Sequence, residues 1–383
     1  MHCLFVTQDF PPDVGGIQTY AAELAPRLAE NADSLAVVAP QRPAADAVDD
    51  ALPFPVHRLP ARPDLLIAPA LAALPVIARR RRIDVALHAQ WPTVAASLLA
   101  RQLTGYPRTI VCAAHGRELL FNPLPPTLGG LYDALRRFTV ARTDHFVPVS
   151  RYTAGLLHDL GVPADRTTVL PNGTNPARFA PQDASALREE LGLTDRRILL
   201  TVGRLVPRKG IDTTLRALPQ IAETVPEVAY LVVGDGPDRD RLTTLARHLG
   251  VADRVHFAGK IAGPDLTRYY NACDVFVMPS REAVPDVEGF GIVFLEAGAC
   301  GKPVIGARAG GVPDAVRDGE TGLLVPPRDA HALAEAATQL LADPEQAQRL
   351  GRQGRERVLQ ENTWDRIADR LFATLRIQAA QAS

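Results

Sequence analysis

Lysine is scarce in this sequence, and so are cysteine, net charge and long apolar runs. Only three of the 42 basic residues are lysine. A lysine inside a motif therefore indicates that a compact ammonium group is needed there, although three chance lysines remain an alternative. The net charge of −1 gives the chain no overall attraction to nucleic acid, so we exclude that partner.

The four cysteines are scattered along the chain and show no metal-ligand spacing. We therefore expect buried free thiols in a reducing cytoplasm. The first ten residues form a short apolar stretch without a basic n-region, which predicts no secretory signal. The cysteines are Cys3, Cys112, Cys273 and Cys300.

The longest apolar run, Leu65–Ala78, is too short to span a bilayer and contains Pro69 and Pro75. It is followed directly by four arginines, so the segment Leu65–Arg82 has two interpretations. It either lies on an anionic membrane surface or is an ordinary helix packed on a sheet with a solvated end. We expect a cytoplasmic protein, with peripheral attachment to the inner face of the membrane as the open alternative.

The length of 383 residues favours two domains over a single core. Short apolar runs typical of strands alternate with amphipathic helical stretches from end to end, which predicts an α/β protein with parallel, doubly wound sheets. The turn-rich stretch Leu170–Pro181 separates two such series. We expect two domains that face a central cleft, with ligands beyond the carboxyl ends of the strands.

The expected strands fall into these two series. The first comprises His2–Thr7, Ser34–Val38, Val85–His88, Thr109–Ala113 and His145–Val149, with a helix at Ile17–Glu30. The second comprises Arg197–Val202, Ala229–Gly234, Val255–Ala258, Val275–Met278, Pro303–Ala307 and Gly322–Val325. The last helix, near Trp364–Ala380, has no strand after it and could pack back across the boundary.

The segment from Glu288 to Glu296 holds two acids eight positions apart, with glycines between them. At 100° per residue, both carboxylates would point to one side of a helix start. The glycines leave backbone N–H groups bare at the N-terminus of that helix, where an anion binds well. Acids for hydroxyls beside amides for a phosphate indicate a sugar-nucleotide site.

Fixed cations follow the first strand of the second series. Arg204 and Lys209 flank a turn that opens onto a helix at Ile211–Thr224, and together they form a seat for a diphosphate leaving group. A solvated run of charge is the alternative. Farther on, Lys260 and Ile261 follow a strand at a point where backbone groups could contact a base.

In the first series, Gly15 and Gly16 precede a helix and could allow close approach of a phosphate or a sugar, or could form a plain turn. His115 ends a strand and therefore faces the cleft, where it could hydrogen-bond a substrate hydroxyl; a purely structural histidine is the alternative. For His88 we favour the structural interpretation. The glycine turn at Gly234 is more typical of structure, whereas that at Gly310 fits packing and ligand contact equally well.

Taken together, these motifs resemble those of the family 4 glycosyltransferases, which are retaining enzymes with the GT-B architecture of two Rossmann-like domains. The resemblance covers nearly the whole chain and is most specific in the Arg/Lys pair and the spaced glutamates. It implies an acceptor-side domain at 1–172 plus about 364–383, and a nucleotide-sugar-binding domain at 173–363. The matching motifs are the Gly15-Gly16 loop, His115-Gly116, Val149-Ser150, Pro171–Gly173, Gly203-Arg204, Arg208–Gly210, Gly234–Gly236, Glu288 to Glu296 and Thr363-Trp364.

The resemblance also implies a role for each matched residue. Arg204 and Lys209 would bind the diphosphate and stabilise its departure, and His115 would meet the donor sugar near the reacting carbon. Glu288 would contact hydroxyls of that sugar, and Glu296 would hold the ribose. Donor phosphate oxygens would contact the backbone around Gly15, Gly16, Phe290, Gly291 and Ile292.

The stretch Asp286–Glu296 looks most like that of the mannosyltransferases that act on phosphatidylinositol mannosides. This implies a hexosyltransferase that moves mannose from GDP-mannose to an acceptor sugar or glycolipid. Glucosyl or N-acetylglucosaminyl transfer from a UDP-sugar is the alternative, and a nucleotide-sugar sensor is the non-enzymatic one. A phosphorylase would need a lysine for pyridoxal phosphate, and none of the three sits in such a context. No Asp-x-Asp cluster is placed to seat a metal, so we expect neither metal nor cofactor.

Overall fold

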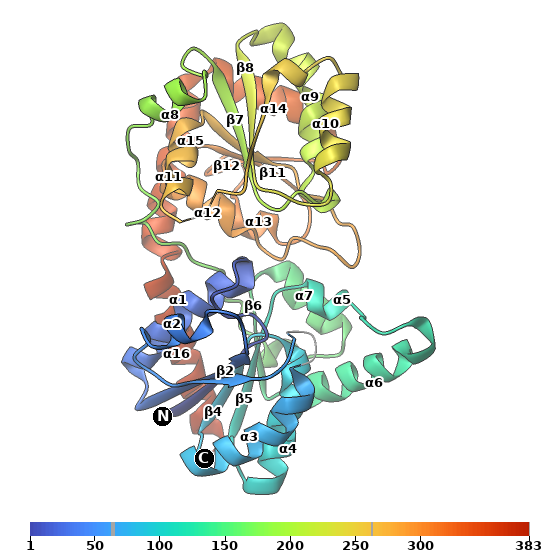
Figure 1. Ribbon diagram of the computed structural model, residues 1–383, viewed down its shortest axis with the longest axis vertical. Helices are drawn as coiled ribbons and strands as arrows, with labels where there is room; N and C mark the ends of the chain where they lie inside the picture. The colour runs from blue at the N-terminus through green and yellow to red at the C-terminus, as the bar shows by residue number, and fades with distance from the viewer. Residues whose placement is uncertain (63–65, 262, 383) are drawn as a thin grey trace. The chain divides into compact units, whose positions relative to one another are not determined.

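The computed structural model describes residues 1–62, 66–261 and 263–382. The chain divides into two compact units. Unit 1 comprises Met1–Asn172 and Trp364–Ser383, and unit 2 comprises Gly173–Thr363. Each unit is an α/β structure built on one parallel six-stranded sheet with helices on both faces (Figure 1).

The sheet of unit 1 has the strand order β3-β2-β1-β4-β5-β6. All of its neighbouring strands pair in parallel, which the buried, nearly continuous apolar strands of the sequence predict. The strands are β1 (His2–Val6), β2 (Ser34–Pro40), β3 (Val56–Leu59), β4 (Val85–His88), β5 (Thr109–Ala114) and β6 (His145–Pro148).

The helices of unit 1 connect these strands and cover both faces of the sheet (Figure 1). The four-residue α5 and the long α6 follow β5. The helices are α1 (Gly16–Asn31), α2 (Ala45–Asp49), α3 (Ile67–Arg81), α4 (Val94–Thr104), α5 (Arg117–Leu120), α6 (Pro126–Arg142), α7 (Arg151–Asp159) and α16 (Trp364–Gln381), with short 3₁₀ turns at Trp91–Thr93 (η2) and Ala164–Arg166 (η3).

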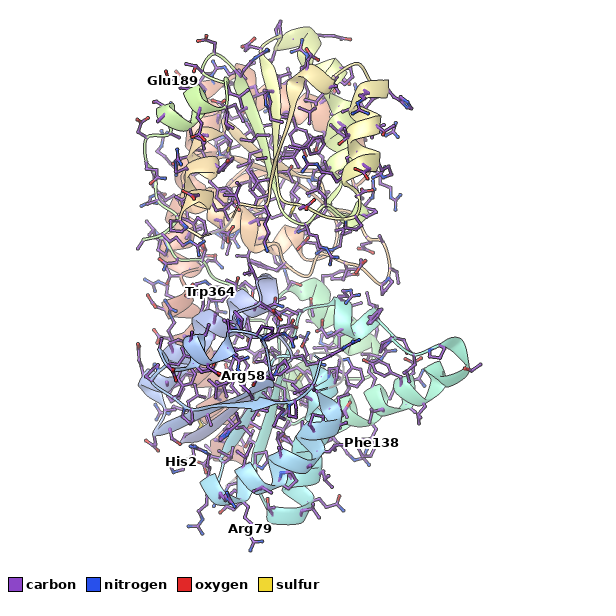
Figure 2. All side chains as sticks on the ribbon, in the orientation of Figure 1. His2, Arg58, Arg79, Phe138, Glu189 and Trp364 are labelled. Carbon is purple, nitrogen blue, oxygen red and sulfur yellow. The ribbon has the colours of Figure 1, made fainter. Side chains whose placement is uncertain are left out.

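Helix α16 joins unit 1 although the residues before it belong to unit 2. Trp364, labelled in Figure 2, is buried and meets the ring of Tyr20 on α1 at 6.3 Å between centroids. Arg27 on α1 also pairs with Asp365 at 2.6 Å. A helix with no strand after it thus completes the apolar layer beside α1.

The sheet of unit 2 has the order β12-β11-β10-β7-β8-β9. Numbered within the unit, this is the same third-second-first-fourth-fifth-sixth order as in unit 1, and it is the order of the doubly wound dinucleotide-binding fold. The strands are β7 (Arg197–Val202), β8 (Val228–Val233), β9 (Val255–Gly259), β10 (Val275–Met278), β11 (Val304–Ala307) and β12 (Gly322–Val325).

The helices of unit 2 also cover both faces of their sheet (Figure 1). The apolar sides of α9, α10 and α14 share one core with the sheet, whereas α12 packs with α15. The helices are α8 (Ser185–Glu190), α9 (Ile211–Thr224), α10 (Arg239–His248), α11 (Asp265–Ala272), α12 (Ile292–Ala299), α13 (Val312–Ala315), α14 (Ala330–Ala342) and α15 (Pro344–Glu361), with 3₁₀ turns at Pro207–Lys209 (η4) and Ala252–Arg254 (η5).

The apolar, proline-containing run forms α3, which continues through both of its prolines. Ala70, Leu74 and Ala78 recur every four residues and pack into the core against β1, β2 and β4. The described part of this segment therefore has the form of an ordinary packed helix; Leu65 lies outside the described residues. Within the described chain, every helix falls short of the length and apolar content that crossing a bilayer requires.

Candidate active site

The strand order of unit 2 changes direction between β7 and β10, its first and fourth strands. In doubly wound folds, ligands bind outside the carboxyl ends of the strands at such a switch point. The loop after β7 carries Arg204, Arg208 and Lys209, and the loop after β10 carries Glu288. The sheet thus places the predicted cations and one predicted acid at the same edge.

Glu288 makes direct ion pairs with two cations of the loop after β7. Lys209 Nζ donates to Glu288 Oε2 at 2.6 Å, and the Arg208 guanidinium donates to the same oxygen. The side chains of Lys209 and Glu288 are only 8% and 12% exposed. Both hydrogen bonds use Oε2, so Oε1 is left to accept a hydrogen bond from a ligand.

Glu288 is ionised at neutral pH. Burial would raise the pKa of Glu288, but the charges of Lys209 and Arg208 outweigh it and bring this pKa down to about 2. Burial lowers the pKa of Lys209, and the Glu288 carboxylate opposes that effect. Two cations and one anion leave a net positive charge at the switch point, which suits an anionic ligand.

Glu296 lies on α12 and is bound from the side by Tyr270 of α11, whose hydroxyl donates to Oε2 at 2.5 Å. Burial raises the pKa of Glu296, and the Tyr270 hydrogen bond opposes this. The positive charges of Arg178 and Lys209 also act on this carboxyl. Lys209 thus forms an ion pair with Glu288 and has a weaker electrostatic interaction with Glu296, so its charge acts on both acids of the motif.

Glu288 does not lie on the helix that the spacing of the two glutamates predicted. Helix α12 begins only at Ile292, and Gly291, with φ 95°, forms its N-cap. The helical rotation of 100° per residue therefore does not apply to Glu288, and that part of the prediction was wrong. A left-handed residue after an irregular loop, rather than helical periodicity, brings the acids together.

Two glycines permit the close approach of these loops. Gly210 has φ 70°, and an added Cβ would lie 2.0 Å from the carbonyl oxygen of Pro279 in the loop after β10. Gly310 has φ 53°, and its Cβ would lie 2.4 Å from the carbonyl oxygen of Glu288. The same carbonyl accepts a hydrogen bond from the N–H of Gly311 at 2.8 Å. The Gly310 turn thus serves to hold the Glu288 backbone.

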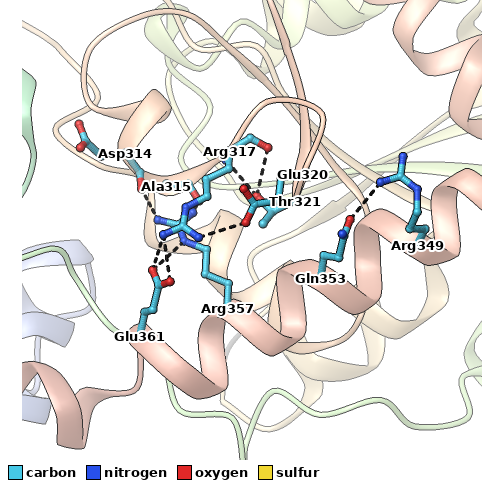
Figure 3. Close-up of polar contacts among 9 residues, drawn as sticks. All are labelled: Asp314, Ala315, Arg317, Glu320, Thr321, Arg349, Gln353, Arg357 and Glu361. Carbon is cyan, nitrogen blue, oxygen red and sulfur yellow. Dashed lines mark hydrogen bonds and ion pairs between the residues drawn. The ribbon is translucent and has the colours of Figure 1, made fainter.

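Helix α15 holds α13, the helix that follows the Gly310 turn, through polar contacts that Figure 3 shows. The buried Arg357 donates to the backbone carbonyls of Asp314 and Ala315 at 2.7 and 2.8 Å, at the end of α13. Glu361 accepts from Arg317 at 2.7 Å and lies 3.4 Å from Arg357. These contacts anchor α13, which begins directly after the glycine turn.

The other predicted donor-binding residues of unit 2 occupy different surroundings. Arg204 is exposed, and among the described residues its guanidinium has no carboxylate partner. Phe290 is buried just before the N-cap of α12. Lys260 is exposed and Ile261 half-buried, directly after β9 at the far edge of the sheet. The Gly234 turn packs on the loop after β7, since a Cβ there would lie 1.9 Å from the carbonyl oxygen of Gly203.

In unit 1 the strand order changes direction between β1 and β4, and His115 follows the next strand, β5. Burial lowers the pKa of His115 to about 4, against a smaller opposing effect of a backbone hydrogen bond at Ala89. The imidazole is therefore neutral at pH 7. Its ring meets Tyr20 edge-on at 4.9 Å, and Glu118 Oε1 accepts from the backbone N–H of His115 at 2.6 Å and of Gly116 at 3.3 Å.

Three side chains near this strand end keep buried acceptor atoms without a partner among the described residues: His115 Nε2, Glu118 Oε2 and Gln90 Oε1. Gln90 also hydrogen-bonds the carboxylate of Asp9, which lies just after β1. Burial raises the pKa of Asp9 and of Glu118. Because buried polar groups are rarely left unpaired, this cluster is suited to a ligand that brings several hydroxyl donors.

Gly15 and Gly16 begin α1. Gly15 forms its N-cap in an extended conformation, and no side chain caps the helix. A Cβ on Gly16 would meet no atom within 4 Å, so the space beside Gly16 is open, whereas a Cβ on Gly15 would lie 2.3 Å from Gln18 Oε1. His88, by contrast, is fully buried, with its ring nitrogens 2.7 Å from Thr93 Oγ1 and 2.9 Å from Ser97 Oγ. His88 therefore has the satisfied structural role that we favoured.

Among the described residues, no group of three or more histidine, cysteine or acidic side chains is arranged to hold a metal ion. The nearest sequence pattern is Asp238-Arg-Asp240, in which Asp238 binds Arg241 through both oxygens at 2.6 Å. The charged groups gathered at the switch point of unit 2 are two cations and one carboxylate, with a net positive charge. The cations can take up negative charge that develops on a leaving group.

Sequence reasoning assigned no role to several residues that the structure places in these clusters. Arg208 precedes Lys209 in the motif, and the two adjacent cations before a glycine could have indicated that both residues belong to the site. Asp9 and Gln90 could have been found because each lies just beyond a strand flanking the switch point. Tyr270 gave no signal, since its position on α11 reads as ordinary helix.

Two family models match the chain. The model described as glycosyl transferases group 1 matches residues 183–357, and the one described as Glycosyltransferase Family 4 matches residues 14–178. A GDP-mannose-dependent alpha-(1-6)-phosphatidylinositol monomannoside mannosyltransferase of Mycobacterium tuberculosis is 39% identical over 97% of both chains. The monoacylated alpha-(1-6)-phosphatidylinositol monomannoside mannosyltransferase of Corynebacterium glutamicum, also GDP-mannose-dependent, is 35% identical over 96% of both.

Solved structures share the fold. The sucrose-phosphate synthase of Thermosynechococcus elongatus superposes with a TM-score of 0.82 over the whole of both chains, at 28% identity. Anabaena HepE, crystallised with UDP, has a TM-score of 0.83 at 24% identity over 98% of this chain and 100% of its own. The expected GT-B architecture is thereby confirmed. With two Rossmann-like units, both family models matched and relatives similar over nearly their full length, the chain belongs to glycosyltransferase family 4 and is a glycosyltransferase.

Proposed function

We propose that this glycosyltransferase moves mannose from GDP-mannose, with retention of configuration, to a hydroxyl of a phosphatidylinositol mannoside or a closely related glycolipid. The observation that carries this proposal is similarity of 35–39% identity, over nearly the full length, to GDP-mannose-dependent enzymes from two genera. Both relatives act on phosphatidylinositol monomannoside according to their names.

Unit 2 binds the donor in this proposal. Lys209 and Arg208 are already held at one point by Glu288, and the exposed Arg204 follows the same strand. The pyrophosphate of the donor binds to these cations and to the uncapped N-terminus of α12 near Phe290, Gly291 and Ile292. Glu288 Oε1 accepts from a hydroxyl of the sugar, and Glu296 accepts from the ribose. Lys260 and Ile261 lie beside the base.

The reaction breaks the bond between the anomeric carbon of mannose and the phosphate oxygen of GDP. The acceptor hydroxyl forms the new bond on the same face, and its proton passes to the departing phosphate oxygen, so GDP leaves with the electron pair. Lys209, Arg208 and Arg204 stabilise the charge that grows on the pyrophosphate. The cations supply this stabilisation without a metal ion.

Unit 1 supplies the acceptor side. The neutral His115 accepts a hydrogen bond from a sugar hydroxyl through Nε2, which is buried and unpartnered among the described residues. Gln90 and Glu118 offer two further acceptors nearby, which suits a polyhydroxylated ring. The backbone at Gly15 and Gly16 lets the ligand approach the start of α1. Peripheral attachment to the inner face of the membrane, through the arginine-rich end of the segment Leu65–Arg82, brings the enzyme to a lipid acceptor.

Incubation of the purified protein with radiolabelled sugar nucleotides and detergent-dispersed phosphatidylinositol monomannoside tests this proposal. GDP-mannose should label the lipid, whereas UDP-glucose and UDP-N-acetylglucosamine should not. Lys209→Met should lower turnover by about two to three orders of magnitude, the range of one electrostatic stabiliser of a transition state. Lys302→Met removes another lysine outside this cluster and serves as the control. Efficient transfer from a UDP-sugar would refute the donor assignment.

A further inference from the structure

Positive charge is concentrated in one part of unit 1. Residues 66–148 contain ten arginines and four acids, whereas the whole chain carries a net charge of −1. Two of the four acids, Asp133 and Asp144, are paired at 2.7 Å with Arg136 and Arg101. A local excess of this size beside a slightly acidic remainder indicates attraction to an anionic surface.

Helix α6 lies within this segment and is anchored along one side. Tyr132 and Leu135 pack against the core beneath it, and the ring of Tyr132 meets Trp91 at 5.1 Å. Asn122 and Arg136 tie the same side to the preceding loop, with Arg136 donating to the carbonyl of Leu119 at 2.7 Å. In Figure 1 the first turns of this helix stand away from the rest of unit 1.

The opposite side of α6 is also apolar, although it is exposed. Leu131 is 70% exposed and Phe138 is 47% exposed, and both lie on one stripe of the helix because they are seven residues apart. Ala134 and Ala141 continue this stripe, which carries Arg137 and Arg142 at its edge. The Arg142 guanidinium stacks over the Phe138 ring at 4.0 Å. We call this set the α6 stripe: Leu131, Ala134, Arg137, Phe138, Ala141 and Arg142.

A cavity of about 490 Å³ opens at the C-terminal end of the α6 stripe. Ala141 and Arg142 line it together with Arg108, Arg166 and Asp144. Asp144 is neutralised by Arg101, and Arg166 donates to backbone carbonyls at the end of α6. Arg108 and Arg142 are exposed, and the described chain provides no carboxylate for either. The cavity therefore joins an apolar stripe to guanidinium groups that can bind a phosphate.

From these features we infer that the α6 stripe docks on the surface of an anionic lipid bilayer. Leu131 and Phe138 enter the boundary between head groups and acyl chains, and Arg137 and Arg142 stay at the level of the lipid phosphates. The cavity lined by Arg108 and Arg142 takes one phosphate head group. This inference deepens the peripheral attachment in the proposed function by assigning the contact to α6 as well as to α3.

Charge favours a bilayer over a second copy of the chain as the occupant. A self-complementary interface would place the arginines of the two stripes near one another, and α6 presents no exposed acid to neutralise them, since its one acid pairs with Arg136. An anionic membrane accepts both the apolar side chains and the arginines, which are the features of an interfacial helix.

Sedimentation of the full-length protein with vesicles tests the inference. Binding should be strong for phosphatidylcholine mixed with phosphatidylglycerol, weak for phosphatidylcholine alone, and reduced by salt. The double variant Leu131→Ser with Phe138→Ser should weaken binding about tenfold, and Arg137→Gln with Arg142→Gln should weaken it to a similar degree and remove the lipid preference. Leu359→Ser changes a 42% exposed leucine on α15 of unit 2 and should have no effect.

A further variant replaces Arg79, Arg80, Arg81 and Arg82 of α3 and its C-cap by glutamine. If this variant loses all vesicle binding while both α6 variants bind normally, the inference fails. It also fails if the serine variant turns a dimer into a monomer in light scattering without changing vesicle binding. Transfer to a detergent-dispersed acceptor should be unchanged in the α6 variants. Loss of vesicle binding with normal transfer thus supports the inference, whereas absence of transfer by the wild type concerns the proposed function only.

Discussion

The ion-pair trio of unit 2 predicts a pH-dependent contribution to stability from a single carboxylate. Glu288→Gln preserves the size and most hydrogen bonds of the side chain and removes its charge. The pKa of this carboxyl falls from 4.5 to about 2 on folding. At about 1.4 kcal/mol per pH unit, this corresponds to about 3 kcal/mol of stabilisation. Because burial of Lys209 opposes its charged form, we expect the measured loss to be somewhat smaller.

The pH window follows from the direction of the shift. A carboxyl whose pKa is lowered by folding stabilises the native state fully above its unfolded value, and this contribution disappears as pH falls through the folded value. The difference between wild type and Glu288→Gln should therefore be full at pH 6 and shrink between about pH 4.5 and 2. Below that window both proteins carry a neutral group at this position.

Urea unfolding at a series of pH values measures this difference. Far-UV circular dichroism reports both units, and tryptophan fluorescence reports unit 1, because Trp91 and Trp364 both lie there. The exposed Glu356 provides a matched control in the variant Glu356→Gln. A loss in Glu288→Gln that stays constant from pH 6 to pH 3, or one no larger than in the control, would refute the electrostatic reasoning.

Three shorter predictions concern other parts of the molecule. Gly310→Ala should lower the free energy of unfolding by about 2 kcal/mol or more, because its Cβ would lie 2.4 Å from a carbonyl oxygen. The melting temperature and turnover should therefore fall together. Gly319→Ala, also at positive φ but in open space, is the milder control. His88→Leu should lower the free energy of unfolding by about 1–3 kcal/mol and leave the KM for the donor unchanged, because it removes a hydrogen-bond partner from two buried hydroxyls, of which Thr93 Oγ1 still donates to the Gln90 carbonyl. A rise in stability would contradict its structural role. Transferase activity should persist in EDTA, measured with the donor in excess. A loss of activity that a divalent metal ion restores would show that Lys209, Arg208 and Arg204 do not suffice to stabilise the leaving group.

The alternation of apolar strands and amphipathic helices predicted the fold class because it follows directly from burial in a parallel sheet. The strand β3 was missed for the same reason. Val56–Leu59 is the edge strand of unit 1, its residues are only half-buried, and it includes His57 and Arg58. Edge position alone does not hide a strand, because the equally half-buried edge strand β9 was predicted; in β3 the central His57 and Arg58 remove the apolar pattern.

For the site, residue type and spacing identified side chains whose role can be inferred from the residue itself and its neighbours in the sequence. Lys209 and Glu288 were chosen from the motif, and the structure joins them although 79 positions separate them. Their contact depends on the order of strands in the sheet, which no local pattern contains. The wrong helical placement of Glu288 has the same origin, since the φ of Gly291 decides where α12 starts. Tyr270 depends on how α11 packs on α12, which also lies beyond local sequence.

The discontinuity of unit 1 has a consequence for synthesis on the ribosome. The layer beside α1 needs Trp364 and Asp365, which emerge more than 300 residues after Tyr20 and Arg27. Unit 2 lies entirely between these segments, so all of its strands are made before unit 1 has its last helix. Unit 2 can therefore fold before unit 1 is complete. Until α16 is made, the apolar side of unit 1 beside α1 is uncovered and accessible to chaperones.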